Sequence, residues 1–175
     1  GLRLNKDTLS AFTISPGNSS RSGTGGDGIY SKTMEILGGI IQKAIGGNAK
    51  GNTCTGGSGI HSDGTLTISG GENDSLTAQG GSGANGISSS GSVTISGGST
   101  VTANGGNGGS LVGGDGIRSG GGLTVSDGTV TAKGGNGDSK DGYGGDGIRS
   151  GGVVTISGNT VNAAGGYGGK GGGYG

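Results

Sequence analysis

The chain has 175 residues, of which 53 are Gly, with one Pro, one Cys, one Phe and no Trp, and its eleven basic and eleven acidic residues leave no net formal charge. Gly occurs in clusters rather than at every third position, which excludes a collagen triple helix, and one Cys can form neither an internal disulfide nor a cysteine zinc site. The balanced charge argues against nucleic-acid binding, and no apolar run is long enough to insert into a membrane as a helix.

Residues 1–24 are predicted to form an N-terminal cap and an incomplete leading coil, and residues 25–175 a single repeat domain. The segment AFTISPG from Ala11 matches the second strand of the repeat described below. In the coil that follows, Met34, Ile36 and Ala44 occupy positions that need apolar residues, although Gln42 would then face inward. We therefore predict a degenerate first full coil.

A repeat begins at residue 28 and is marked by the dipeptide Gly-Ile. Its copies start, with spacings of 27 to 31 residues, at Gly28, Gly59, Gly86, Gly116 and Gly147. Second segments follow the last four copies, from Thr65, Ser92, Gly122 and Val153, and third segments follow from Ser75, Thr100, Thr129 and Thr160. Each unit ends in a Gly-rich connection. The order predicts about five coils of 27 to 31 residues, each with three short strands.

Apolar and polar residues alternate within the segments, which is the period of a strand with one buried face. The residues expected to face inward are Leu66, Ile68, Leu76, Val93, Ile95, Val101, Leu123, Val125, Val130, Val154, Ile156 and Val161. One coil cannot fold alone, because each buried aliphatic residue contributes roughly 1.5–3 kcal/mol whereas ordering each residue costs roughly 1–2 kcal/mol. Stacked coils align these residues in columns. The sequence thus predicts an all-β fold, a right-handed parallel β-helix.

The Gly-rich tail from about residue 165 parallels the sequence at 134–144, after which another coil begins. Two interpretations of this pattern are open. The chain is a fragment of a longer solenoid, or its last coil is closed by the Gly-Tyr tail or by a partner.

Aspartates are the first candidates for a binding site. Asp27, Asp115 and Asp146 each stand two residues before the inward Ile in the motif GGDGI, and Asp63 begins a later turn. Carboxylates and carbonyls in Gly turns are hard oxygen ligands that suit Ca²⁺. The alternative is that these aspartates stabilise turns, because their side chains accept hydrogen bonds from nearby backbone amides.

Arg118 and Arg149 directly follow the inward Ile of successive coils, and other coils carry Tyr30, His61 and Ser88 at this place. Stacking would bring the two guanidinium groups to roughly 5 Å from each other. They are candidates for an anion or uronate contact, since Arg binds carboxylates through two parallel hydrogen bonds. The alternative is a surface ladder in which each Arg pairs with its own Asp.

Further candidates lie around these arginines and on the third strands. His61 is the only histidine, so it cannot build a histidine metal cluster, and we interpret it as a surface residue that is also a candidate ligand contact. Tyr30 and Tyr143 are candidates for stacking on sugar rings. A flat threonine face is expected from Thr77, Thr100, Thr102, Thr129 and Thr131, an array of the type used by solenoids that bind ice, with plain β-propensity as the alternative.

The string HSDGTLTISGG from His61, with GDGI and SLTAQGG nearby, resembles the repeat of a bacterial extracellular family of carbohydrate-binding parallel β-helix proteins. Some members of that family bind calcium and acidic plant polysaccharide. The resemblance covers roughly residues 25–165 and implies a location outside the cell. In that family an Asp-Gly pair recurs before the TISGG strand, and here Asp63-Gly64 keeps it. If calcium is bound as the resemblance implies, Asp63 and the GGDGI aspartates are the candidate ligands.

The first functional hypothesis is a secreted or cell-surface, non-catalytic module that binds a polysaccharide or cell-surface glycan, or acts as an adhesin. A structural spacer or self-assembling fibre segment is the alternative, since the open ends of a solenoid invite end-to-end association. Ice binding and a polysaccharide lyase-like activity are less favoured. Calcium is the one cofactor that the sequence suggests.

Overall fold

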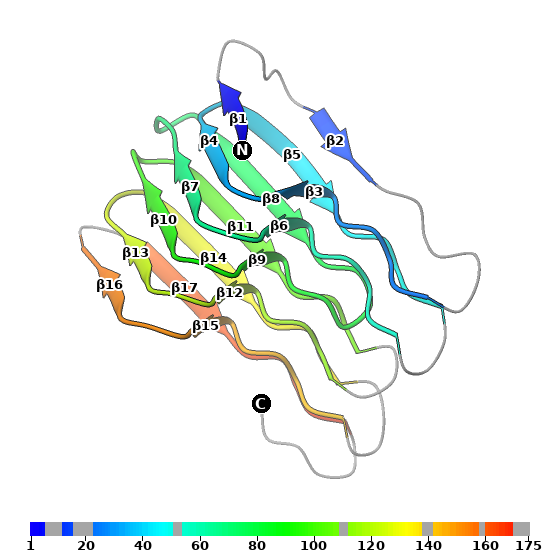
Figure 1. Ribbon diagram of the computed structural model, residues 1–175. Coiled ribbons are helices and arrows are strands. Elements are labelled where there is room, and N and C mark those ends of the chain that lie inside the picture. The colour runs from blue at the N-terminus through cyan, green and yellow to red at the C-terminus, as the bar shows by residue number, and fades with distance from the viewer. Residues whose placement is uncertain are drawn as a thin grey trace.

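The computed structural model describes residues 1–5, 12–15, 23–50, 54–108, 112–137, 142–157 and 160–169. Within these ranges every regular element is a β-strand, and the strands wind as a right-handed parallel β-helix whose coils stack along one axis (Figure 1). The predicted fold class is therefore confirmed. The described residues contain no helix that could span a membrane.

Each coil gives one strand to each of three parallel sheets, numbered here in chain order within a coil. Sheet 1 contains β3 (Ile29–Ser31), β6 (Ile60–Ser62), β9 (Ile87–Ser89), β12 (Ile117–Ser119) and β15 (Ile148–Ser150). Sheet 2 contains β1 (Leu2–Asn5), β4 (Met34–Leu37), β7 (Leu66–Ser69), β10 (Val93–Ser96), β13 (Leu123–Val125) and β16 (Val154–Ile156). Sheet 3 contains β2 (Phe12–Ile14), β5 (Ile40–Ile45), β8 (Ser75–Gln79), β11 (Thr100–Asn104), β14 (Thr129–Lys133) and β17 (Thr160–Ala164). Coils 1 to 5 run from β3–β5 to β15–β17, after a leading partial coil of β1 and β2.

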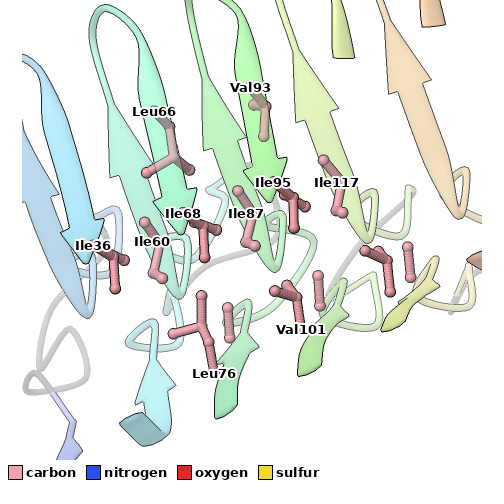
Figure 2. Close-up of a cluster of buried hydrophobic side chains, with 14 of the residues drawn as sticks. Ile36, Ile60, Leu66, Ile68, Leu76, Ile87, Val93, Ile95, Val101 and Ile117 are labelled. Carbon is pink, nitrogen blue, oxygen red and sulfur yellow. The ribbon is translucent and has the colours of Figure 1, made fainter. Parts of the chain in front are cut away.

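The predicted inward residues form aliphatic columns inside the solenoid (Figure 2). In sheet 2, Val93 pairs in register with Leu66 on one side and Leu123 on the other, and all three side chains are 0% exposed. Sheet 3 supplies an equivalent buried column made of Leu76, Val101 and Val130. Each coil covers the apolar surface of its neighbour, so the stack supplies the core that one coil lacks.

The columns are open at the last coil. Val154 and Ile156 pair in register with Leu123 and Val125, as predicted. They are nevertheless 45% and 48% exposed, because β16 has a neighbour on one side only among the described strands of sheet 2.

The leading partial coil differs from the sequence interpretation. Phe12–Ile14 forms β2 in sheet 3 and pairs with β5, so its assignment as a second strand was wrong. The second strand of this coil is β1, which pairs with β4 and which the repeat comparison missed because it lacks the TISGG ending. Residues 6–11 and 16–22 of the predicted cap, and the predicted tail beyond residue 169, lie outside the described residues.

A β-bulge corrects the expected direction of Gln42. Ile41 pairs with Leu76 and Ala44 with Ala78, so two residues of β5 oppose one residue of β8. Gln42 and its neighbour Lys43 are both exposed, and Ala44 returns to the core. The extra residue restores the inward alternation that strict pairing would have broken.

Two Gly-rich arms complete each coil, one leaving sheet 3 and one returning to sheet 1 (Figure 1). Outgoing and returning arms alternate along the stack: the Gly57 N–H donates to Gly47 O, and the Gly81 N–H to Gly57 O, both at 2.9 Å. A Cβ placed on Gly57 would lie 2.1 Å from Gly26 O. The close approach of backbones therefore requires glycine here, whereas positive φ values occur at corners such as Gly97 (φ 80°) and Gly98 (φ 84°).

Candidate functional site

The outer face of sheet 1 brings four of the five predicted ligand-binding residues into one file, and Tyr143 lies outside it. The middle residue of each strand points away from the core, because the flanking Ile and Ser face inward. The file, in register from coil 1 to coil 5, consists of Tyr30, His61, Ser88, Arg118 and Arg149. The predicted stacking of Arg118 on Arg149 is confirmed.

The two arginines do not form the alternative Asp–Arg ladder. Both are exposed, and within the described residues the ion pairs are Arg3–Glu35 and the two contacts of His61 with Asp27 and Asp63. Arg118 and Arg149 are in none of them. Two guanidinium groups one coil apart therefore face solvent with their donors available.

Asp115 forms no ion pair with an arginine among the described residues, and its carboxylate instead makes a hydrogen bond between coils, called a rung below. Its side chain is 6% exposed, and its Oδ1 accepts a hydrogen bond from the Asp146 N–H at 2.9 Å. Burial raises the pKa of Asp115 above its ordinary value, and the Asp146 carboxylate adds to the rise, whereas the Asp146 N–H and the two arginines act in the opposite direction. The arginines thus influence Asp115 electrostatically without pairing with it.

The same rung recurs along the solenoid. Asp27 Oδ1 accepts a hydrogen bond from the Ser58 N–H at 2.6 Å, and Asn85 Oδ1 accepts one from the Asp115 N–H at 2.9 Å. Each residue stands two positions before the inward Ile and bonds the backbone of the equivalent residue in the next coil. This arrangement agrees with the turn-stabilising interpretation of the aspartates.

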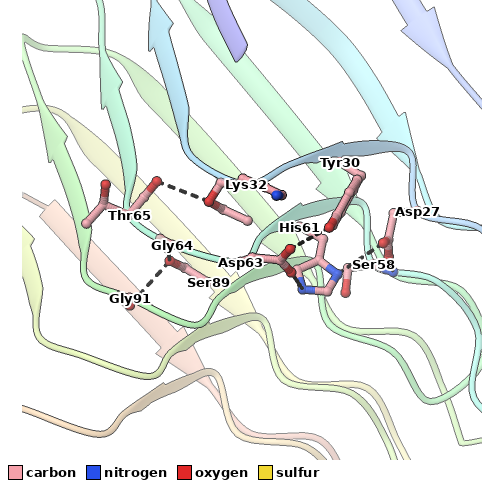
Figure 3. A network of polar contacts seen from close by, with 11 residues as sticks. Asp27, Tyr30, Lys32, Ser58, His61, Asp63, Gly64, Thr65, Ser89 and Gly91 are labelled. Atoms are coloured by element: carbon pink, nitrogen blue, oxygen red, sulfur yellow. Dashed lines mark hydrogen bonds and ion pairs between the residues drawn. The ribbon is translucent and has the colours of Figure 1, made fainter. Parts of the chain in front are cut away.

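A polar network around His61 occupies the N-terminal end of the file (Figure 3). His61 Nδ1 lies 3.0 Å from Asp27 Oδ2, and Nε2 lies 3.6 Å from Asp63 Oδ1. The Tyr30 hydroxyl donates a hydrogen bond to Asp63 Oδ2, and the Tyr30 ring meets the imidazole edge-on with centroids 5.5 Å apart. The hydrogen bond to Asp63 is the main reason that the pKa of Tyr30 is raised, and burial adds to it. The network ties coil 1 to coil 2.

Sequence reasoning missed both carboxylate partners of His61, and it missed a column of inward serines. The partners could have been found from the register, because Asp27 stands three residues before Tyr30, the residue that stacks on His61. The serines end each strand of sheet 1, and Ser62, Ser89 and Ser119 are buried. Their hydroxyls donate to turn carbonyls, as at Ser89 Oγ, which lies 2.6 Å from Gly64 O. The signal was the Ser at the third place of every one of these strands.

The four predicted calcium ligands do not come together. Asp27 and Asp63 flank His61 at coils 1 and 2, whereas Asp115 and Asp146 belong to coils 4 and 5. Across the described ranges, no group of three or more His, Cys, Asp or Glu side chains is placed to hold a metal ion. Calcium takes six to eight oxygen ligands, more than either of these two separate pairs of aspartates supplies by itself. Calcium binding stays a prediction from the resemblance.

Tyr143 lies on the returning arm that leads to β15, six residues before Arg149. It is 57% exposed and forms an isolated parallel bridge with Val112, which is 52% exposed. Along this segment Tyr143, Asp146 and Arg149 are exposed, and the residues between them are buried or half-buried. An aromatic ring, a carboxylate and a guanidinium therefore follow one another at every third residue.

The threonine face of sheet 3 exists but is short. Thr77, Thr102 and Thr131 lie in register, and so do Ser75, Thr100 and Thr129. The file is interrupted at coil 5 by Asn162 and at coil 1 by the bulge. The regular part covers coils 2 to 4. Thr is common in β-strands in any case, so β-propensity alone also accounts for this array.

Comparison of the chain with known proteins gave no match to a family model, to a curated protein or to a solved structure.

Proposed function

We propose that the protein is a non-catalytic glycan-binding module that takes an acidic polysaccharide on the outer face of sheet 1. The observation that carries the proposal is the stack of Arg118 on Arg149, exposed and without an ion pair among the described residues. This pair corresponds to the uronate contact that we expected from the sequence. The protein would meet such a ligand outside the cell.

The chemistry of this face suits a chain of sugar acids. A guanidinium binds a carboxylate through two parallel hydrogen bonds, and stacked strands lie about 4.8 Å apart, so two successive coils offer two such contacts along the axis. The exposed ring of Tyr143 can cover the apolar face of a sugar, and the exposed Asp146 can accept hydrogen bonds from hydroxyl groups. The parallel ladders hold these groups on a rigid surface.

Binding is favoured over cleavage by the state of the nearby acids. Hydrolysis of a glycosidic bond commonly needs an acid and a base placed on either side of it. Asp115 is buried and already accepts the Asp146 N–H, so it does not serve a ligand on this face. The arginines and Tyr143 then act as recognition groups.

The test measures binding of a galacturonate oligomer by isothermal titration calorimetry. Charge-assisted hydrogen bonds contribute about 1.5–3 kcal/mol each, so the double variant Arg118→Gln/Arg149→Gln should weaken binding by at least about tenfold. The matched control is Arg3→Gln, which removes an Arg that is paired with Glu35 on sheet 2. The methyl-esterified oligomer, which has the same length without the charge, should bind poorly to the wild type.

Three results would count against the proposal. The first is the absence of galacturonate binding by the wild-type protein. The second is equal affinity of the double variant and the wild type, and the third is equal affinity for the charged and esterified oligomers. Each would show that the arginine pair does not recognise sugar carboxylates.

A further inference from the structure

The C-terminal end of the solenoid is an unfinished coil surface. Sheets 1, 2 and 3 end there with β15, β16 and β17, each of which has a neighbour on one side only among the described strands. Val154 and Ile156 are 45% and 48% exposed, whereas their partners in coil 4, Leu123 and Val125, are 0% exposed. Coil 5 covers Leu123 and Val125, whereas no described coil covers Val154 and Ile156. This surface, made of β15, β16 and β17, is called the C-face below.

The N-terminal end presents the complementary surface. Sheets 2 and 3 begin there with β1 and β2, whose outer edges have no neighbour among the described strands. Leu2 and Leu4 alternate with more exposed residues, pair in register with Met34 and Ile36, and pack partly buried against the core. This surface, made of β1 and β2, is called the N-face. It carries the inward pattern that each coil uses to cover the one before it.

We propose that a second copy of this chain docks its N-face on the C-face, head to tail, so that the solenoid continues across the joint. In this arrangement β1 of one copy pairs in parallel with β16 of the other, and β2 pairs with β17. Leu2 and Leu4 then cover Val154 and Ile156, as β16 itself covers β13. Backbone groups at both edges gain the partners that edge strands lack.

Several features favour a second copy in this orientation. Parallel pairing keeps all strands in the direction seen in every ladder of the molecule. Two C-faces placed against each other would pair their edge strands antiparallel, unlike every ladder between the described strands. The outward residue that would meet Arg3 at the joint is Thr155, so no like charge opposes pairing. A head-to-tail contact that does not close on itself produces a linear filament.

The joint is made by two of the three sheets. Among the described strands, sheet 1 has five and sheets 2 and 3 have six, so the described leading coil contributes no strand to sheet 1. At each joint sheet 1 therefore lacks one three-residue strand. The contact between copies should accordingly be weaker than the contact between internal coils, and assembly should depend on protein concentration.

Analytical ultracentrifugation of the 175-residue chain tests the proposal with two blocked variants. Val154→Lys/Ile156→Lys blocks the C-face, and Leu2→Lys/Leu4→Lys blocks the N-face. Thr94→Lys/Thr124→Lys adds the same charge to the outer face of sheet 2 in internal coils and is the matched control. Circular dichroism and thermal melting confirm that each variant is folded.

The wild type and the control should form larger species as concentration rises, and each blocked variant should stay monomeric, with at least a tenfold weaker association. An equimolar mixture of the two blocked variants should give one-to-one dimers and nothing longer, because one intact N-face then meets one intact C-face. An excess of the C-face variant should shorten wild-type assemblies, a readout that does not need the N-face variant to fold.

Three outcomes would overturn the proposal. A wild type that is monomeric at all concentrations shows that the faces do not associate. A blocked variant that still dimerises by itself shows a face-to-face contact or another surface. A mixture of two folded blocked variants that stays monomeric shows that the N-face and the C-face are not partners.

Discussion

Replacing one glycine of the arms by alanine tests whether they form a packed layer of backbone. A Cβ on Gly106 would lie 1.7 Å from Gly81 O, and a backbone carbonyl cannot move aside as a flexible side chain can. Gly106 also donates to Ala84 O at 2.8 Å and accepts from the Gly114 N–H at 2.9 Å. If both hydrogen bonds are lost and their groups stay buried, the loss is about 1–3 kcal/mol for each. Gly106→Ala should therefore lower the free energy of unfolding by about 2–6 kcal/mol.

Gly71→Ala is the matched control, because its nearest neighbour would be Asp74 Oδ2 at 3.7 Å, an ordinary contact, and its φ is not positive. At a compatible site this substitution should change stability by less than about 1 kcal/mol, in the stabilising direction. Urea unfolding followed by circular dichroism measures both variants. If Gly106→Ala is as mild as Gly71→Ala, the arms are loose loops and the argument from close backbone packing fails.

Two further substitutions test the core and the rungs. Leu123→Ala should lower the free energy of unfolding by about 2–5 kcal/mol, because Leu123 is 0% exposed, whereas Val154→Ala should lose less than half as much because Val154 is 45% exposed. Equal losses in urea unfolding would contradict the stacked columns. Asp115→Asn should raise the melting temperature at neutral pH, because burial raises the pKa of Asp115, so stability is lost as the pH rises through that pKa, while an amide keeps the Oδ1 acceptor. The gain should vanish in acid, where Asp115 is protonated, and a lower melting temperature at neutral pH would show that the attraction of the two arginines outweighs burial.

The core could be predicted because two simple periods determine it. Strand alternation fixes which residues face inward, and the repeat spacing fixes which of them stack, as for Leu66, Val93 and Leu123. Prediction failed where these periods are interrupted. The bulge in β5 adds a residue that alternation cannot reveal, and β1 lacks the motif by which the other second strands were found.

The register of the candidate site residues could be predicted from the sequence, but the ion pairs and hydrogen bonds of their side chains could not. Equivalent places in a repeat must lie in register, so the file from Tyr30 to Arg149 followed from spacing alone. Whether Asp115 pairs with Arg118 depends on a competition that the sequence does not display. The Asp146 N–H needs an acceptor, and leaving such a group unsatisfied costs about 1–3 kcal/mol, whereas an exposed ion pair contributes at most about 1 kcal/mol. The carboxylate therefore accepts the backbone N–H, and the guanidinium has no ion pair among the described residues.

This division between backbone and surface explains why one backbone carries such different residues along the file. Inner columns and the hydrogen bonds between coils fix the geometry of the coils, so the outward residue of a sheet 1 strand can differ from coil to coil. At coils 1 and 2 the file is closed by its own contacts, because His61 lies between Asp27 and Asp63. At coils 4 and 5 the same position carries two arginines that the rungs leave without a carboxylate partner in the described chain. A ligand that recognises this face should therefore contact the C-terminal half of the file, and its binding should depend on Arg118 and Arg149 far more than on His61.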